Sequence, residues 1–167
     1  SCRVYINQLA NQVRDLQITK GGPVVMVQAE NEFGSYVAQR KDIPLEVHKK
    51  YAAQIRQQLL DAGFDIPMFT SDGSWLFKGG SIEGALPTAN GEGNIEKLKQ
   101  VVNEYHGGVG PYMVAEFYPG WLSHWAEPFP RVSTESVVKQ TKKYLDNGVS
   151  LNYYMVHGGT NFGFTTG

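Results

Sequence analysis

The chain has 167 residues, a formal net charge of −1 at pH 7 and 41% hydrophobic residues. This composition is typical of a globular protein and excludes a disordered or collagen-like chain. The sequence has no basic cluster suited to nucleic acid and no apolar run near the ~18 residues of a membrane span. Its single cysteine, Cys2, excludes an internal disulfide and leaves the compartment open. Because the sequence lacks an initiator Met and stops at Gly167, we expect a fragment of a longer protein.

Helical and strand patterns alternate along the chain. At the N-terminus, Ile6, Leu9 and Val13 recur at helical spacing and predict a helix over residues 3–17. The other predicted helices cover residues 45–60, 95–105 and 133–145. The predicted strands cover residues 23–28, 67–72, 112–118 and 150–156, with a weaker candidate at 81–86. Such alternation predicts βα units and a parallel sheet.

The strand predicted at residues 23–28 runs directly into the polar residues Glu30, Asn31 and Glu32. Carboxylates at the end of a buried strand are costly unless they are paired or functional. Parallel α/β folds place their ligands at this end of the strands. The cluster is therefore either a salt-bridge group that caps the next helix or part of a site. For Glu30 we favour a supporting group buried against an Arg or the barrel interior.

A second informative stretch, residues 112–125, combines one carboxylate, Glu116, with several aromatic rings. Sugar rings have apolar C–H faces beside their hydroxyls, so aromatic walls and fixed polar groups suit them. We expect Tyr118 and Trp121 to lie in a sugar site, and Phe117 and Trp125 to belong to the core.

Both stretches, and the final one at residues 150–163, resemble motifs of glycoside hydrolase family 35, the retaining β-galactosidases. The resemblance is densest in residues 21–36, which read GGPVVMVQAENEFGSY. It implies a hydrolase that releases terminal β-D-galactosyl residues through a covalent galactosyl-enzyme. Glu32 is then the acid/base and Glu116 the nucleophile. The implied substrate-binding residues are Asn31, Tyr118, Trp121 and Tyr154, with the Tyr154 phenol hydrogen-bonded to Glu116.

The spacing of the two glutamates favours a TIM (β/α)8 barrel. Glu32 and Glu116 are 84 positions apart, close to three units of ~30 residues. Strands ~4.8 Å apart and tilted ~36° give a ring of roughly 7–8 Å radius, which brings the two carboxyls to about 5 Å. This separation suits a retaining enzyme and is too short for an inverting one. The resemblance implies that residues 1–167 form a partial barrel domain covering strands 4 to 8.

One conflict remains in the first motif. Residues of one parity share a face of a strand, so Glu30 and Glu32 would point together and Asn31 away. The resemblance places Asn31 in the site as well. We therefore expect the strand to bulge or to end near Glu30.

The sequence suggests no cofactor and no metal, because its four histidines are scattered without metal-site spacing. The expected partners are a galactoside substrate and the missing N-terminal part of the same barrel, not nucleic acid or a membrane. Family resemblance favours a secreted, periplasmic or lysosomal protein. Two alternatives stay open: an exo-β-glucosaminidase-type hydrolase of the same fold, and a non-catalytic carbohydrate-binding fragment.

Overall fold

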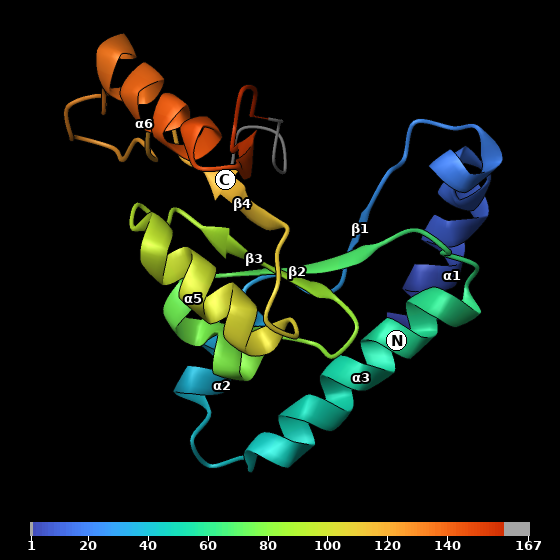
Figure 1. The fold of residues 1–167 in the computed structure, drawn as a ribbon. Helices are drawn as coiled ribbons and strands as arrows, with labels where there is room; N and C mark the ends of the chain where they lie inside the picture. The colour runs from blue at the N-terminus through green and yellow to red at the C-terminus, as the bar shows by residue number, and fades with distance from the viewer. Residues whose placement is uncertain (1, 159–167) are drawn as a thin grey trace.

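The computed structural model describes residues 2–158 and shows a five-stranded parallel sheet with the strands in sequence order (Figure 1). Each strand pairs in parallel with the next one along the chain. The strands are β1 (Val27–Gln28), β2 (Met68–Asp72), β3 (Leu86–Asn90), β4 (Tyr112–Phe117) and β5 (Val149–Tyr153). This strand order is that of a half-barrel, and it puts the carboxyl ends of all five strands at one edge.

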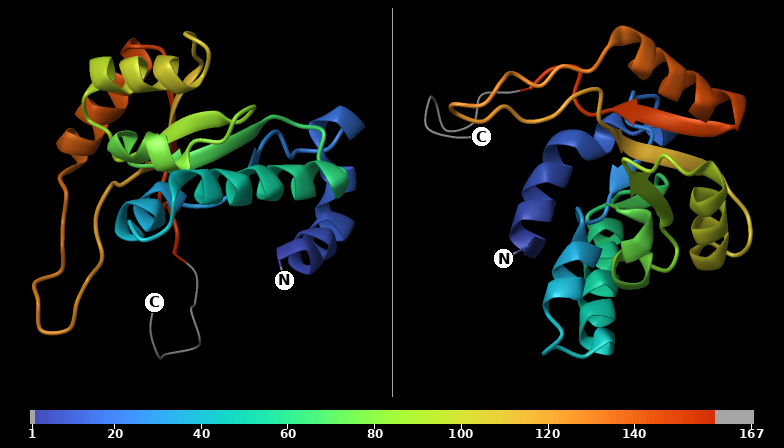
Figure 2. Two further views of the ribbon diagram at one scale, coloured as in Figure 1. Left: turned by 90° about the horizontal axis from the view of Figure 1, so that it is seen from below. Right: turned by 90° about the vertical axis from the view of Figure 1, so that its left-hand side faces the viewer.

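Helices make every connection between the strands, as the βα pattern predicts. They are α1 (Cys2–Val13), α2 (Phe33–Gln39), α3 (Leu45–Asp61), α4 (Phe77–Gly80), α5 (Ile95–Tyr105) and α6 (Thr134–Asp146), with short 3₁₀ turns at Arg14–Leu16, Ile18–Lys20 and Ser74–Leu76. Figure 2 shows α3 along the sheet near β1 and β2, while α5 and α6 lie by the later strands. The α/β class is therefore confirmed, and the exact strand range within a barrel stays a prediction.

Side-chain caps begin the two helices that flank β4. Asn94 accepts a hydrogen bond from the Lys97 N–H at the start of α5. Ser133 accepts one from the Ser136 N–H at the start of α6. These oxygens satisfy backbone donors that have no partner within the helix, which sets where each helix begins.

The core divides into two apolar clusters. One joins α1 and α3 to the first two strands and includes Ile6, Ile55 and Met68. The other joins α5 and α6 to the last three strands and includes Leu98 and Val114. The carboxyl ends of β2 and β3 carry buried polar residues instead, among them Ser71, Asp72 and Asn90.

The first predicted helix and strand are both shorter than expected. The helix ends at Val13, and only Val27–Gln28 of the predicted strand 23–28 pairs with β2. The segment between α1 and β1 pairs with itself instead: Val24 bridges to Gln17, and the Val24 N–H donates to the Leu16 carbonyl at 2.9 Å. The buried Gln17 amide also donates to the carbonyls of Arg14 and Gly63.

Two other predicted strands need correction. The weak candidate at 81–86 is a turn, because Ala85 N–H bonds the Ile82 carbonyl and Gly84 has φ of +78°. The strand follows it as β3. The final strand ends at Tyr153 instead of residue 156, and the part of the last motif beyond residue 158 lies outside the described residues.

Glycine at position 80 permits a close contact between α4 and the end of β2. A Cβ there would lie 1.7 Å from the Asp72 Oδ2 and 3.0 Å from the Gly34 N. We predict that Gly80→Ala lowers the free energy of unfolding by about 1–3 kcal/mol, because the buried carboxylate must move. Urea unfolding measures it. Gly93→Ala is the control, since its nearest neighbour would be 3.8 Å away, and an equal loss in both variants would contradict the packing argument.

Candidate functional site

Strand β1 ends before the first polar motif, and the chain then turns sharply. The Gln28 amide donates to the Glu30 carbonyl and to the Asn31 Oδ1, each at 2.8 Å. Glu30 and Glu32 both adopt left-handed backbone conformations, with φ of +66° and +50°. Such conformations are strained for residues with a Cβ and are found at functional sites. The expected irregularity near Glu30 is confirmed, and it removes the strand alternation that separated Asn31 from Glu32.

The backbone of Glu32 is bonded to β2 and its carboxylate to β3. Glu32 stands at the N-cap of α2, and its backbone N–H donates to the Ser71 carbonyl at 2.8 Å. Its carboxylate Oε1 accepts a hydrogen bond from the Asn90 amide at 2.9 Å. Sequence reasoning missed Asn90 because it assigned the strand to residues 81–86. Had the strand been assigned to residues 86–90, the position of Asn90 at its carboxyl end would have indicated a site residue.

Glu116 lies near the end of β4, directly beside β3. In the sheet register Asn90 is the partner of Glu116, and the Gly91 N–H donates to the Glu116 carbonyl at 2.8 Å. The Glu116 carboxylate Oε2 accepts a hydrogen bond from the Tyr118 phenol at 2.8 Å. Burial, and then this bond to Glu116, raise the pKa of Tyr118 above its ordinary value. Tyr118 therefore keeps its proton and remains a donor to Glu116.

Tyr154 was expected to lie beside Glu116 with its phenol bonded to the carboxylate, and among the described residues the phenol that bonds Glu116 is that of Tyr118. Tyr154 instead packs edge-on against the Tyr118 ring, with centroids 6.1 Å apart. The Trp121 ring meets Tyr118 from another direction, 5.4 Å away and also edge-on. Tyr118 has this position because it follows Glu116 by two residues and lies on the same face of the extended chain.

The core assignment of the remaining aromatic residues is half correct. Phe117 is buried between Tyr144 and Tyr153, with ring centroids 5.4 Å and 5.3 Å away. Trp125, in contrast, is fully exposed in the described chain. It lies on the long connection between β4 and α6, where no element covers it.

One cleft of about 780 Å³ collects all six candidate residues. They come from three separate segments of the chain, at the carboxyl ends of β1, β4 and β5. The cleft is lined by Asn31, Glu32, Glu116, Tyr118, Trp121 and Tyr154, together with residues of the β4–α6 connection such as Phe129 and Arg131, which sequence reasoning missed. Two carboxylates and several aromatic rings in one cleft match the chemistry of a sugar site.

Glu30 lies beside the site but does not line the cleft. Its carboxylate accepts a hydrogen bond from the Tyr51 phenol of α3 and a longer one, at 3.3 Å, from the Asn31 N–H. Burial and the bond to Glu30 raise the pKa of Tyr51. Glu30 thus has the expected supporting place, although a tyrosine and not an Arg holds it.

Asp72 is a third carboxylate close to the site, at the end of β2. It is 2% exposed, and its Oδ2 accepts a hydrogen bond from the Gly34 N–H of α2 at 3.2 Å. Its other oxygen has no partner among the described residues. Burial raises the pKa of Asp72 to about 6, and the negative charge of Glu32 acts in the same direction.

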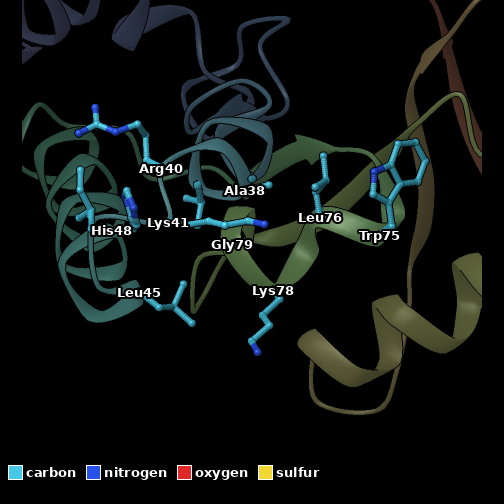
Figure 3. Close-up of a pocket in the computed structure, with 12 residues that line it drawn as sticks. Ala38, Arg40, Lys41, Leu45, His48, Trp75, Leu76, Lys78 and Gly79 are labelled. Atoms are coloured by element: carbon cyan, nitrogen blue, oxygen red, sulfur yellow. The ribbon is translucent and has the colours of Figure 1, made fainter.

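A second hollow, of about 320 Å³, lies between α2, the start of α3 and the segment that includes α4 (Figure 3). The cations Arg40, Lys41 and Lys78 surround it, and Arg40 is already paired with Asp42 through bonds of 2.9 and 2.7 Å. None of the six candidate residues lines this hollow. We therefore place the site in the larger cleft.

Residues 2–158 contain no cluster of three or more side chains able to hold a metal ion. In the same range no helix has the length and apolarity needed to cross a membrane. The secreted, periplasmic or lysosomal location stays a prediction.

Comparison with known proteins gives a consistent result. The model of glycosyl hydrolases family 35 matches residues 1–167. Beta-galactosidase-1-like protein 3 of Rattus norvegicus is 35% identical over 167 residues, which are 98% of this chain and 24% of that protein. Beta-galactosidase of Homo sapiens is 33% identical over 166 residues, which are 98% of this chain and 24% of that protein. Beta-galactosidase of Xanthomonas manihotis is 34% identical, with 99% and 26% covered. The chain therefore spans about a quarter of the length of these curated relatives.

The raised pKa of Asp72 predicts a pH-dependent stability. The folded protein holds this proton up to pH about 6, whereas the unfolded chain releases it near its ordinary value of 3.8. The stabilising contribution is therefore present below pH 4 and is lost as pH rises to 6, by about 3 kcal/mol. Because Asp72→Asn cannot ionise, it should gain roughly 2–3 kcal/mol relative to the wild type between pH 4 and pH 7.5.

Urea unfolding at the two pH values measures this difference. The exposed Asp146→Asn at the end of α6 is the control. If Asp72→Asn and the wild type differed by the same free energy at both pH values, Asp72 would not titrate in this window.

Proposed function

Since the chain belongs to glycosyl hydrolases family 35, we propose that it forms the catalytic part of a retaining β-galactosidase. The observation that supports this most is the single cleft that holds both Glu32 and Glu116. In the proposal, β1 to β5 are strands 4 to 8 of a TIM barrel, and residues 1–167 form a partial barrel domain. The open edges of the sheet, and the quarter of the relatives' length that the chain covers, agree with this.

Glu116 acts as the nucleophile that attacks the anomeric carbon of the galactosyl residue. The Tyr118 phenol donates to its Oε2, which stabilises the ionised carboxylate and fixes its orientation. Attack forms a covalent bond between a Glu116 oxygen and the sugar carbon as the glycosidic bond breaks. The bonding electrons leave with the glycosidic oxygen.

Glu32 acts as the acid and then as the base. Protonated Glu32 donates its proton to the departing glycosidic oxygen, so the leaving group departs as a neutral alcohol. In the second step the Glu32 carboxylate takes a proton from water, and the resulting hydroxide displaces Glu116 from the sugar carbon. The two inversions give net retention, and both carboxyls return to their starting protonation states.

The other cleft residues bind the sugar. Asn31 is fixed by the Gln28 amide, which leaves its own amide N–H₂ to donate to a sugar hydroxyl next to the reacting carbon. Trp121 is 65% exposed and supplies an aromatic face at the rim of the cleft, with Tyr154 nearby. A binding module would need these aromatic groups but not two carboxylates in one cleft. We therefore prefer the enzyme to the non-catalytic alternative, and galactoside to glucosaminide by the names of the relatives.

A mechanism-based label tests the nucleophile directly. The complete protein that contains this chain is treated with an activated 2-fluoro-β-galactoside, which traps the covalent intermediate, and the labelled peptide is sequenced. We expect the label on Glu116 and none after Glu116→Gln, which cannot attack. An activated 5-fluoro-β-glucosaminide, which keeps the 2-amino group, serves as the sugar control. Label on a different residue would refute the assignment.

The bond from Tyr118 to Glu116 gives a second prediction. Tyr118→Phe keeps the ring that packs against Trp121 and Tyr154 but removes the donor. We expect kcat for a β-galactoside to fall by about 10- to 100-fold, because one charge-assisted hydrogen bond to the nucleophile is lost. Steady-state kinetics measures it.

Tyr112→Phe is the matched control for this experiment. It removes a phenol donor of the same kind, bonded to Asn103 at 2.9 Å and distant from the cleft. Equal losses in the two variants, or full activity of Tyr118→Phe, would show that the phenol does not support the nucleophile.

A further inference from the structure

We propose that Asn90 is a positioning residue that sets the orientation of the acid/base Glu32 and determines which of its oxygens carries the transferable proton. This inference rests on the proposed function of Glu32. The inference assigns a role to a side chain that the prediction from sequence motifs did not include. Asn90 acts through Glu32 and not on the sugar.

The position of Asn90 is determined by the sheet. Asn90 is the last residue of β3 and is 6% exposed. The register between β3 and β4 shifts here, so that Ala89 pairs with Val114 and Asn90 with Glu116. This irregularity places the Asn90 backbone directly beside that of Glu116, while the Asn90 side chain bonds Glu32. Asn90 thus links the two carboxylates of the cleft.

Glu32 and Asn90 are joined in a closed ring of hydrogen bonds through Ser71. The buried Ser71 hydroxyl donates to the Asn90 Oδ1 at 2.5 Å, and the Asn90 Nδ2 donates to the Glu32 Oε1 at 2.9 Å. The Glu32 N–H returns to the Ser71 carbonyl at 2.8 Å. Both the backbone and the carboxylate of Glu32 are therefore tied to one residue of β2. A ring of this kind holds a side chain that would otherwise rotate freely in solvent.

The ring also decides where the acidic proton resides. A hydroxyl donating to the Asn90 Oδ1 turns the amide N–H₂ group toward Glu32. An amide N–H₂ only donates, and the carbonyl oxygen of a protonated carboxyl accepts a hydrogen bond better than its hydroxyl oxygen does. The bond from Asn90 therefore favours the carbonyl at Oε1 and the proton on Oε2. One oxygen then serves both steps, donating to the leaving group and later accepting from water, with no rotation of the carboxyl between them.

Kinetics with different leaving groups separates this role from a purely structural one. Protonation matters most when the departing alcohol is a poor leaving group, as in lactose, and hardly at all for 2,4-dinitrophenyl β-galactoside. We expect Asn90→Ala to lower kcat/KM for lactose by about tenfold or more, which corresponds to one lost hydrogen bond to a charged group. On the dinitrophenyl substrate the loss should stay below about threefold, because attack by Glu116 is unchanged.

Three further variants of the complete protein make the test decisive. Ser71→Ala keeps Asn90 but removes the hydrogen bond that orients its amide. We expect a smaller loss of kcat/KM, again larger for lactose than for the dinitrophenyl substrate. If Asn90→Ala is too unstable to assay, Ser71→Ala provides the test. Asn103→Ala removes another asparagine hydrogen bond, far from the cleft, and should affect neither substrate. Glu32→Ala is the reference and should show the strongest dependence on leaving group.

The outcomes distinguish this inference from the proposed function. If Glu32→Ala lacks the leaving-group dependence, the acid role of Glu32 fails and the proposed function with it. If Glu32→Ala shows the dependence but Asn90→Ala and Ser71→Ala lose equal activity on both substrates, or none, Asn90 has no positioning role and the inference is overturned.

Discussion

Parallel pairing of β1 to β5 is the constraint on which the cleft depends. Because every strand points the same way, the residues that follow each strand meet at one edge of the sheet. Glu32 after β1, Asn90 at the end of β3 and Glu116 in β4 come from segments far apart in sequence. The register between neighbouring strands brings them to a common level, where hydrogen bonds connect them. The apolar residues of α3, α5 and α6 pack in two clusters with those of the strands.

The acidic groups around the cleft are held by neutral donors. Tyr51 bonds Glu30, Asn90 bonds Glu32, and Tyr118 bonds Glu116. A neutral donor orients a carboxylate without cancelling its charge, whereas a bound cation would neutralise the group and occupy its lone pairs. Asp72 also has a neutral donor, the Gly34 N–H, but it is so deeply buried that its pKa rises to about 6. The arrangement leaves the carboxylates of the cleft available for chemistry.

The main errors of the sequence-based prediction are the extent of the first strand, the position of β3 and the burial of Trp125. Periodicity placed β2, α3 and α5 within a residue or two of their bounds. It extended the first strand too far because it could not show that Val24 pairs with the segment around Gln17 and not with β2. It also misplaced β3, and Asn90 was lost with it. Trp125 was assigned to the core because hydrophobicity alone says nothing of which segments meet.

Local pattern determined the α/β class and the order of the main elements, and the resemblance of short motifs to those of a known family supplied the six residues that line the cleft. The tertiary structure decided which side chain holds which carboxylate. In the structure Tyr118, and not Tyr154, donates the hydrogen bond to Glu116, and Asn90 donates one to Glu32. The Asn90–Glu32 pair joins residues from different strands, and its geometry follows from the left-handed turn at Glu32 and the irregularity in the β3–β4 ladder. Tyr118 follows Glu116 by two residues, so their bond depends on the course of the chain at the end of β4. The sequence indicated only that the first strand bulges or ends near Glu30. The irregularity at Asn90 has no signature in composition or spacing, because it arises only when β3 and β4 are packed side by side.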